Sequence, residues 1–419
     1  MIRHRPFGSG HPYSVDTEQR SPVDPIAGEP LTLGVRTSAN VTSVQCEVLR
    51  EAGSTRHSLE PVTRHSRGQA IDGGHLASAQ ARLARTSGGW QLTFDDLVAH
   101  EGLKYRFHAT HVGGTIEKTR WFDVRVFSWR SADDAISAAG QSKVIDKSIE
   151  VLDDGQRIHR LRFALPLQPG EHVTGLGERF NALDHRGAAL DSVVFEQYKN
   201  QGAERKTYMP MPFAHIVGGT GWGFHLRTSR RAWFDFGATV ADRALVEVDV
   251  DAATDAPGIL EVAFYDGRPS EVLQAFLREV GAPEELPSWV FRLWASGNEW
   301  NTQNEVLRQA DLHREHEIPV GSIVIEAWSD ESTFTVWRDA RYNIAADGGP
   351  LRLDDFEFPA EGAWPDPKGM IDELHDRDIR LVLWQIPLIK TRPHPTGQVR
   401  ADAEAAISDG YVVQELAPD

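Results

Sequence analysis

The sequence predicts a multidomain protein that combines β-sandwiches with an α/β region, and three observations predict this class. The chain has 419 residues, more than one ordinary hydrophobic core accommodates. Short runs of alternating apolar and polar residues fill roughly the first two thirds of the chain, as in antiparallel sheets. The pattern then changes to strand followed by helix, which predicts parallel strands joined by crossover helices.

Composition narrows the classes of partner. The formal net charge is −17 at pH 7, whereas affinity for nucleic acid or anionic membranes depends on Lys and Arg. We therefore expect no nucleic acid and no membrane partner, and no apolar run reaches the ~20 residues that span a bilayer. Cys46 is the only cysteine, so no internal disulfide can form. The segment MIRHRPFGSGHPYSVD lacks the apolar stretch of a secretion signal, and a cytoplasmic protein is predicted.

Residues 1–130 are expected to form a sandwich of immunoglobulin-like size. Five β-rich runs alternate with Gly, Asn and Ser clusters: LTLGVRT, SVQCEVLR, WQLTFDDL, LKYRFHATHV and TRWFDVRVF. In KYRFHA, the alternation places Tyr105 and Phe107 on one face and polar side chains on the other, as a half-buried antiparallel strand requires. Those polar side chains are Lys104, Arg106 and His108.

Residues 140–283 are expected to form a larger antiparallel sandwich. A polar stretch, SADDAISAAGQSK, predicts a linker or a domain boundary near residues 131–143. The β-rich runs that follow are IHRLRFALPL, FAHIVGG, GWGFHLRT, RAWFDFG, ALVEVDV and GILEVAFYDG. The region ends in PSEVLQAFLREVG, a predicted helix with apolar residues at helical spacing. These residues are Val272, Leu273, Phe276, Leu277 and Val280.

Residues 284–419 show three apolar runs, FRLWAS, SIVIEAW and IRLVLWQIP, separated by amphipathic helical patterns. Two helix starts are recognisable, a capping box and an acidic cap followed by proline: Thr302 with Glu305, and Asp366 with Pro367. Between Ser329 and Trp364 the sequence predicts a long irregular insertion. The pattern indicates three β/α units, whereas a closed (β/α)8 barrel needs eight.

Aromatic and acidic side chains follow the three predicted strands. In a barrel the chemistry lies where parallel strands end and loops begin. The flat apolar face of a pyranose stacks on an indole ring while its hydroxyls donate to carboxylates, so the pattern indicates a saccharide site. The candidate residues are Trp300, Glu326, Trp328 and Trp384. Tryptophans at strand ends also pack between a sheet and its helices, so packing is an alternative interpretation of these residues.

Three motifs occur in an order that resembles the beginning of the catalytic barrel of glycoside hydrolase family 31, the α-glucosidase and α-xylosidase family. They are LPSWVFRLWAS, then IPVGSIVIEAW, then WPDPKGMIDELHDRDIRLVLWQIPLI. Upstream, TGLGERFNALDHRG is similar to the GxGE signature of that family's amino-terminal sandwich. The resemblance covers residues 140–419 and implies a galactose-mutarotase-like sandwich followed by an incomplete (β/α)8 barrel.

The resemblance implies a retaining α-glycoside hydrolase that acts on an α-linked oligosaccharide or glycoside, with neither metal nor organic cofactor. The family's nucleophile follows the fourth barrel strand and its acid comes later. We therefore expect no catalytic residue among the 419 present, and no turnover by this chain alone. Trp300, Glu326 and Trp384 match binding positions of the family. The family usually has Asp where this chain has Glu326, so the sequence does not identify the preferred sugar. It does not indicate the oligomeric state either.

Other readings of single residues are weaker. Glu299 and Glu326 would lie on neighbouring strand ends, but a catalytic pair must flank the sugar. His313 and His316 are three apart on a predicted helix, and no third zinc ligand has a supporting spacing. GLGERF lacks the third glycine of a dinucleotide loop and is more plausibly a tight β turn.

One rival function belongs to a different class, a non-catalytic carbohydrate-binding or scaffolding protein. Trp90, Trp121 and Trp129 would then supply a flat sugar platform, although burial in a sandwich core is an equal alternative. A set of three parallel strands also leaves an open edge. We expect the last third of the chain to be less well ordered than the sandwiches.

Overall fold

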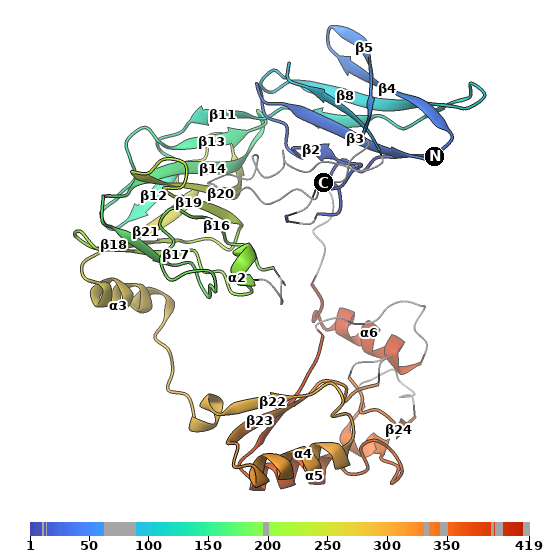
Figure 1. Cartoon of the computed structure of the whole chain (residues 1–419), viewed down its shortest axis with the longest axis vertical. Coiled ribbons are helices and arrows are strands. Elements are labelled where there is room, and N and C mark those ends of the chain that lie inside the picture. Colours follow the sequence, from blue (N-terminus) through green and yellow to red (C-terminus); the bar gives the residue numbers. More distant parts are fainter. Residues whose placement is uncertain are drawn as a thin grey trace. The chain divides into compact units, whose positions relative to one another are not determined.

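The computed structural model shows two compact units, Met1–Ala282 and Pro283–Asp419, each described here by itself (Figure 1). The structure describes residues 1–10, 12–13, 15–62, 89–195, 201–330, 335–343, 351–386, 389 and 397–413. No helix in this described part is both long and apolar enough to cross a bilayer.

The first region of unit 1 consists of two facing antiparallel sheets (Figure 1). One sheet contains β1 (Ile2–Arg3), β2 (Arg20–Ser21), β3 (Leu31–Thr37), β6 (Glu60–Val62) and β7 (Gly89–Phe94). The other contains β4 (Val41–Arg50), β5 (Gly53–Ser58), β8 (Gly102–His111), β9 (Ile116–Lys118) and β10 (Phe122–Arg125). Apolar side chains of both sheets, Cys46 among them, form one buried cluster. The two-sheet β structure is thus confirmed, and its assignment as immunoglobulin-like stays a prediction.

Strand β8 confirms the alternation predicted from KYRFHA. Tyr105 and Phe107 are fully buried in the core. His108 lies on the opposite face, as the alternation predicts, but it is covered there and only 4% exposed. The neighbouring strand β4 places the carboxylate of Glu47 2.7 Å from His108 Nε2. A hydrogen-bonded carboxylate makes the burial of this polar ring tolerable.

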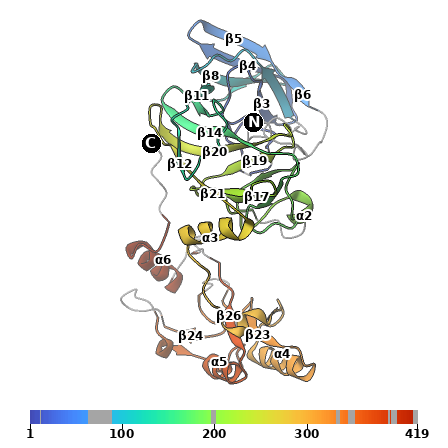
Figure 2. The ribbon, with the colours of Figure 1, turned by 90° about the vertical axis from the view of Figure 1, so that its left-hand side faces the viewer.

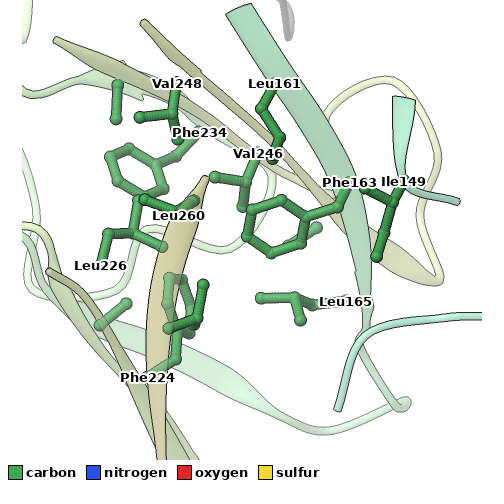
Figure 3. Close-up of a cluster of buried hydrophobic side chains, with 14 of the residues drawn as sticks. Ile149, Leu161, Phe163, Leu165, Phe224, Leu226, Phe234, Val246, Val248 and Leu260 are labelled. Carbon is green, nitrogen blue, oxygen red and sulfur yellow. The ribbon is translucent and has the colours of Figure 1, made fainter. Parts of the chain in front are cut away.

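The second region of unit 1 is a larger pair of sheets. The first sheet contains β11 (Ser128–Ser131), β13 (Glu150–Asp153), β14 (Arg157–Pro166), β20 (Arg243–Ala253), β19 (Ala232–Phe236) and β16 (Ala189–Asp191), in that order. The second contains β12 (Ile136–Ala139), β21 (Leu260–Asp266), β18 (Trp222–Leu226), β17 (Phe213–Val217) and β15 (His172–Gly175). A short helix α2 (Gln201–Glu204) lies in the loops. Side chains such as Phe163 and Val246 meet Phe224 and Leu260 between the sheets (Figure 3).

The stretch near residues 131–143, predicted to be a linker or a domain boundary, is not an irregular linker, because it contains strands. β11 pairs with β13, and β12 pairs in parallel with β21. Both are edge strands of their sheets. Edge strands carry polar side chains on exposed faces, which gives them the composition of a linker. Strands upstream of residue 140 thus pair within the sheets of the second region.

Helix α3 (Pro269–Val280) packs against the sheet of β17, β18 and β21 (Figure 2). Its buried side chains are Val272 and Phe276, and the Phe276 ring stacks on Phe213 at 4.1 Å between centroids. Leu273 and Val280, which were expected on the same apolar face, are about half exposed. The helix contacts the sheet along a narrower stripe than its sequence predicts.

Unit 2 contains a parallel sheet in the order β22 (Leu293–Ser296), β23 (Val320–Ile325) and β26 (Arg380–Leu383). Helices α4 (Gln303–Glu315) and α5 (Pro367–Asp376) contact each other on one face of this sheet (Figure 1). Sequential strand order with both crossover helices on one face is the arrangement of a barrel wall. The predicted partial (β/α)8 barrel is confirmed. Both helix starts are confirmed as well, with hydrogen bonds from backbone N–H groups to Thr302 and Asp366.

The stretch between β23 and α5 is more regular than the sequence predicts. It contains β24 (Arg341–Tyr342), the 3₁₀ turn η2 (Leu353–Asp355) and β25 (Phe356–Glu357), which pairs with β24. A 3₁₀ turn η1 (Ser288–Phe291) precedes β22. A further helix, α6 (Gln398–Ser408), follows β26 and was not expected.

Candidate functional site

Three of the residues at the strand ends of unit 2 share one edge of the sheet. Ser296 is the last residue of β22, Glu326 follows β23, and Trp384 follows β26. The strands are parallel, and the register pairs Ser296 with Val324 and Ile325 with Leu383. Their carboxyl ends therefore lie together, which is where barrel enzymes place binding and catalytic groups.

Glu326 is half-buried and held by the neighbouring strand. The hydroxyl of Ser296 donates a hydrogen bond to Glu326 Oε1 at 2.7 Å. In the part of the chain that the structure describes, this is the one protein group that hydrogen-bonds the carboxylate. Sequence reasoning missed Ser296, although it ends the quoted run FRLWAS, because nothing but the strand register marks its partner.

Trp384 has an exposed ring on a backbone that is hydrogen-bonded to the neighbouring strand. Its N–H donates to the carbonyl of Ile325 at 3.1 Å, which continues the pairing of β26 with β23. Its side chain is 43% exposed. An indole ring that is open on a rigid strand end is suited to stacking on the apolar face of a sugar.

Trp328 lies beneath this edge. Its ring is only 3% exposed, and its Nε1–H donates to the carbonyl of Trp384 at 2.6 Å. It also meets the ring of Trp337 edge to face at 5.1 Å, and Trp337 meets Trp364 in the same way. These three indole rings connect the segment between β23 and α5 to the sheet. Trp328 thus stabilises the backbone at Trp384 through this hydrogen bond, and its own ring is buried. The predicted contact between Trp328 and substrate therefore gains no support.

Trp300 is turned toward helix α4. Its ring is half-buried against the core of unit 2 and meets the His313 ring edge to face at 6.1 Å. Gly297 lies over the ring so closely that a Cβ at that position would come within 2.6 Å of Trp300 Cε2. Among the described residues, no hydrogen bond or ring contact joins Trp300 to Glu326 or Trp384. The register therefore places Glu326 and Trp384 on neighbouring strand ends, whereas the Trp300 ring packs against helix α4.

The weaker candidates have separate surroundings. Glu299 is exposed, and within the described ranges no hydrogen bond joins it to Glu326. Nδ1 of His313 lies 2.7 Å from the carbonyl of Gln309, one turn earlier in α4. Among the described residues, no three His, Cys, Asp or Glu side chains are grouped so that they could hold a metal ion.

The tryptophans proposed as a platform on the sandwiches are partly covered. The guanidinium of Arg106 lies 4.3 Å from the Trp121 ring centroid, and that of Arg162 lies 4.0 Å from the Trp129 centroid. Trp90 packs on the first core and donates from Nε1 to Thr37 at 3.0 Å. These cation–π contacts occupy one face of the rings at positions 121 and 129.

Comparisons with known proteins match most of the chain. Family models match as "1,3-alpha-isomaltosidase-like, N-terminal domain" at residues 8–109, "Glycosyl hydrolase 31 N-terminal galactose mutarotase-like domain" at 71–235 and "Glycosyl hydrolases family 31 TIM-barrel domain" at 283–416. A 1,3-alpha-isomaltosidase of Kribbella flavida is 50% identical over 420 residues, which cover 99% of this chain and 56% of the relative.

Two further relatives are similar to this chain. An isomaltosyltransferase of Sporosarcina globispora is 33% identical over 244 residues, or 58% of this chain and 22% of that protein. The solved structure of a cycloalternan-degrading enzyme from Trueperella pyogenes in complex with isomaltose superimposes with a TM-score of 0.84 and 42% identity. The match covers 99% of this chain and 55% of that structure. These two proteins, from Kribbella flavida and Trueperella pyogenes, match nearly the whole of this chain, and the chain spans about half of the length of each.

Proposed function

We propose, from the premise that this chain belongs to glycoside hydrolase family 31 and carries the amino-terminal part of its fold, that the protein hydrolyses α-linked oligosaccharides. The preferred substrates are those that release an isomaltosyl unit. This choice is supported by relatives whose names state isomaltosidase, isomaltosyltransferase and cycloalternan-degrading activity.

The observation that carries the proposal is the edge formed by Glu326 and Trp384. A carboxylate held by Ser296 at 2.7 Å stands at the end of one strand, and a 43% exposed indole stands at the end of the next. The carboxylate accepts hydrogen bonds from sugar hydroxyls, and the indole stacks on the ring's apolar face. This pairing of groups fixes the orientation of a pyranose at the mouth of a barrel.

The proposed chemistry is hydrolysis with retention of configuration. One carboxylate attacks the anomeric carbon while a second carboxylic acid protonates the leaving oxygen, the two lying ~5 Å apart, and water deprotonated by that second group then hydrolyses the glycosyl–enzyme bond and frees the first carboxylate. At the described edge, Glu326 has a hydroxyl neighbour rather than a second carboxylate. We assign binding to the three strands present and the reacting pair to barrel strands outside the 419 residues. Such a pair needs neither metal nor organic cofactor, so chelation by EDTA should leave the rate unchanged.

The experiment compares the 419-residue chain with the product of the complete reading frame. Both are incubated with an isomaltosyl α-1,3-glucoside, an aryl α-glucoside and an aryl α-xyloside, and the released sugar is followed by NMR. We expect the complete product to release isomaltose first as its α-anomer and the 419-residue chain to release none. Initial formation of the β-anomer, or a preference for the xyloside, would overturn the mechanism or the substrate. Turnover by the 419-residue chain would overturn the assignment of the reacting pair.

A further inference from the structure

We propose that Ser296 is a positioning residue for the saccharide-binding carboxylate of Glu326. The serine and the glutamate act as a matched pair that determines how the sugar is held. This inference rests on the proposed function, because it names a further residue of the same site.

The geometry of the pair follows from the register of β22 and β23. Ser296 is paired with Val324, and Glu326 is two residues further along the chain. Side chains two residues apart on a strand point to the same face, so the three side chains share one face of the sheet. The glutamate reaches diagonally back across the strand spacing, and its Oε1 accepts the Ser296 hydroxyl at 2.7 Å.

The length of the glutamate is essential to this contact. An aspartate at position 326 would draw the carboxylate back by one C–C bond, ~1.5 Å. The 2.7 Å contact would then open to ~4 Å, beyond hydrogen-bonding distance. The additional methylene and the serine hydroxyl are therefore useful only together.

The contact leaves the carboxylate fixed but available. Oε1 is occupied by Ser296, and Oε2 receives no hydrogen bond from any described residue. A hydrogen bond to a charged oxygen is stronger than one between neutral groups, so it restricts the rotamers of a flexible side chain. A carboxylate that is already ordered loses less entropy when a sugar hydroxyl binds to Oε2.

The test is a double-mutant cycle in the product of the complete reading frame. The variants are Ser296→Ala, Ser296→Thr, Glu326→Asp and the double variant Ser296→Ala/Glu326→Asp. The dissociation constant of isomaltose is measured by calorimetry, and KM and kcat are measured on the isomaltosyl substrate. Ser229→Ala, at an exposed serine in a loop of the second sandwich, is the matched control.

We expect Ser296→Ala to raise Kd and KM ~3- to 10-fold while kcat changes less than ~2-fold, because the lost contact orders the binding group and not the reacting atoms. Ser296→Thr keeps the hydroxyl and should stay within ~2-fold of the wild type. In the Glu326→Asp background, Ser296→Ala should add less than ~2-fold, since the pair is already broken.

Three results would overturn the inference: no effect of Ser296→Ala, an equal loss in Ser296→Thr, or a full additional loss in the Glu326→Asp background. A loss in Ser229→Ala would show that the assay reports folding and not the site, which also removes the support. If the wild type neither binds isomaltose nor turns over the substrate, the result contradicts the proposed function itself. The two failures are thus separable, because the inference alone fails when the wild type is active and Ser296→Ala is unchanged.

Discussion

His4 joins the start of the chain to the interior of the first sandwich through both ring nitrogens. Nδ1 lies 2.7 Å from the carbonyl of Gly34, and Nε2 lies 2.7 Å from the hydroxyl of Tyr105. A carbonyl can only accept, so Nδ1 carries the proton and Nε2 accepts from the tyrosine. Burial lowers the pKa of His4 to about 4. The ring is therefore neutral at pH 7, and a second proton would be costly.

The His4 environment predicts a pH-dependent stability. The unfolded chain binds a proton at the ordinary pKa of 6.5, whereas the folded chain binds it at about 4. Between these values the unfolded state holds more protons, so the free energy of unfolding falls as pH drops from 6.5 toward 4. The total fall is about 3 kcal/mol. In the folded chain Glu47 and Glu279, whose pKa values are about 2, stay charged across this window, whereas in the unfolded chain both begin to bind protons near the ordinary pKa of 4.5. They therefore add to the fall at the acid end of the window, and His4 accounts for the part above about pH 5.

Denaturant unfolding at a series of pH values, on the wild type and His4→Gln, measures this effect. Glutamine can donate to the Gly34 carbonyl and accept from Tyr105 but does not titrate. We expect a flatter dependence in His4→Gln, while His57→Gln, at an exposed position in β5, should keep the wild-type slope. Equal slopes in all three proteins would show that His4 is not the titrating group.

The site could be predicted in part from single residues. Glu326 and Trp384 are recognisable because each directly follows an apolar strand. Ser296 could not be recognised, since its role depends on the register between two strands, which the sequence does not specify. Trp300 and Trp328 could not be separated from Trp384, because packing on a helix and stacking on a sugar use the same ring.

Among the elements, helix α3 is attached to its sheet by one ring and one carboxylate. Phe276 stacks on Phe213 at 4.1 Å. Glu279 accepts hydrogen bonds from the Tyr265 hydroxyl at 2.6 Å and from Arg227 Nε at 2.8 Å. These side-chain hydrogen bonds and that of His225 outweigh desolvation and hold the pKa of Glu279 at about 2. The helix is thus fixed at its middle and at its carboxyl end.

Truncation of α3 tests which side chains hold it. Phe276→Ala should lower the free energy of unfolding by ~3–5 kcal/mol, because it removes a buried ring and leaves a cavity. Leu273→Ala, one turn away and 47% exposed, should cost less than ~1 kcal/mol. Urea unfolding followed by tryptophan fluorescence compares the two variants. Similar losses would mean that the predicted wider face of the helix is the one in contact.

Elements were predictable where the apolar period is strong. The alternation in β8 and the helical spacing in α5 are set by burial on one face, and the sequence carries that pattern directly. Strands β11 and β12 were missed because edge strands are polar. Helix α6 was missed although RADAEAAIS has high helix propensity. Strands β24 and β25 are two residues long, too short to leave a period.

At the scale of the whole molecule, the two units differ in how their sheets end. In unit 1 both sandwiches enclose large buried clusters between facing sheets. In the described part of unit 2, β22 and β26 each pair on one side only. Leu293 and Trp294 on β22 are nearly half exposed. Unpaired N–H groups and exposed apolar rings leave this sheet with fewer stabilising contacts.

Amide exchange should therefore separate the two units. We expect amides of β22 and β26 to exchange at least ~10-fold faster than those of β14 and β20, which are central in their sheet. Mass spectrometry of peptides from the 419-residue chain measures both sets in one sample. In the complete product, further barrel strands should slow exchange in β22 and β26 and leave β14 unchanged. Equal protection in the 419-residue chain would show that the three-stranded sheet is stable without them.

The buried thiol of Cys46 could report how often the first sandwich opens. It is the sole cysteine of the chain and lies fully inside the core, where burial raises the thiol pKa to about 12. An alkylating reagent needs an accessible thiolate, so each covalent tag would record one opening of this sandwich. Tagging would not report fraying of the sheet in unit 2, so the opening of the first sandwich could be timed without probing the other unit.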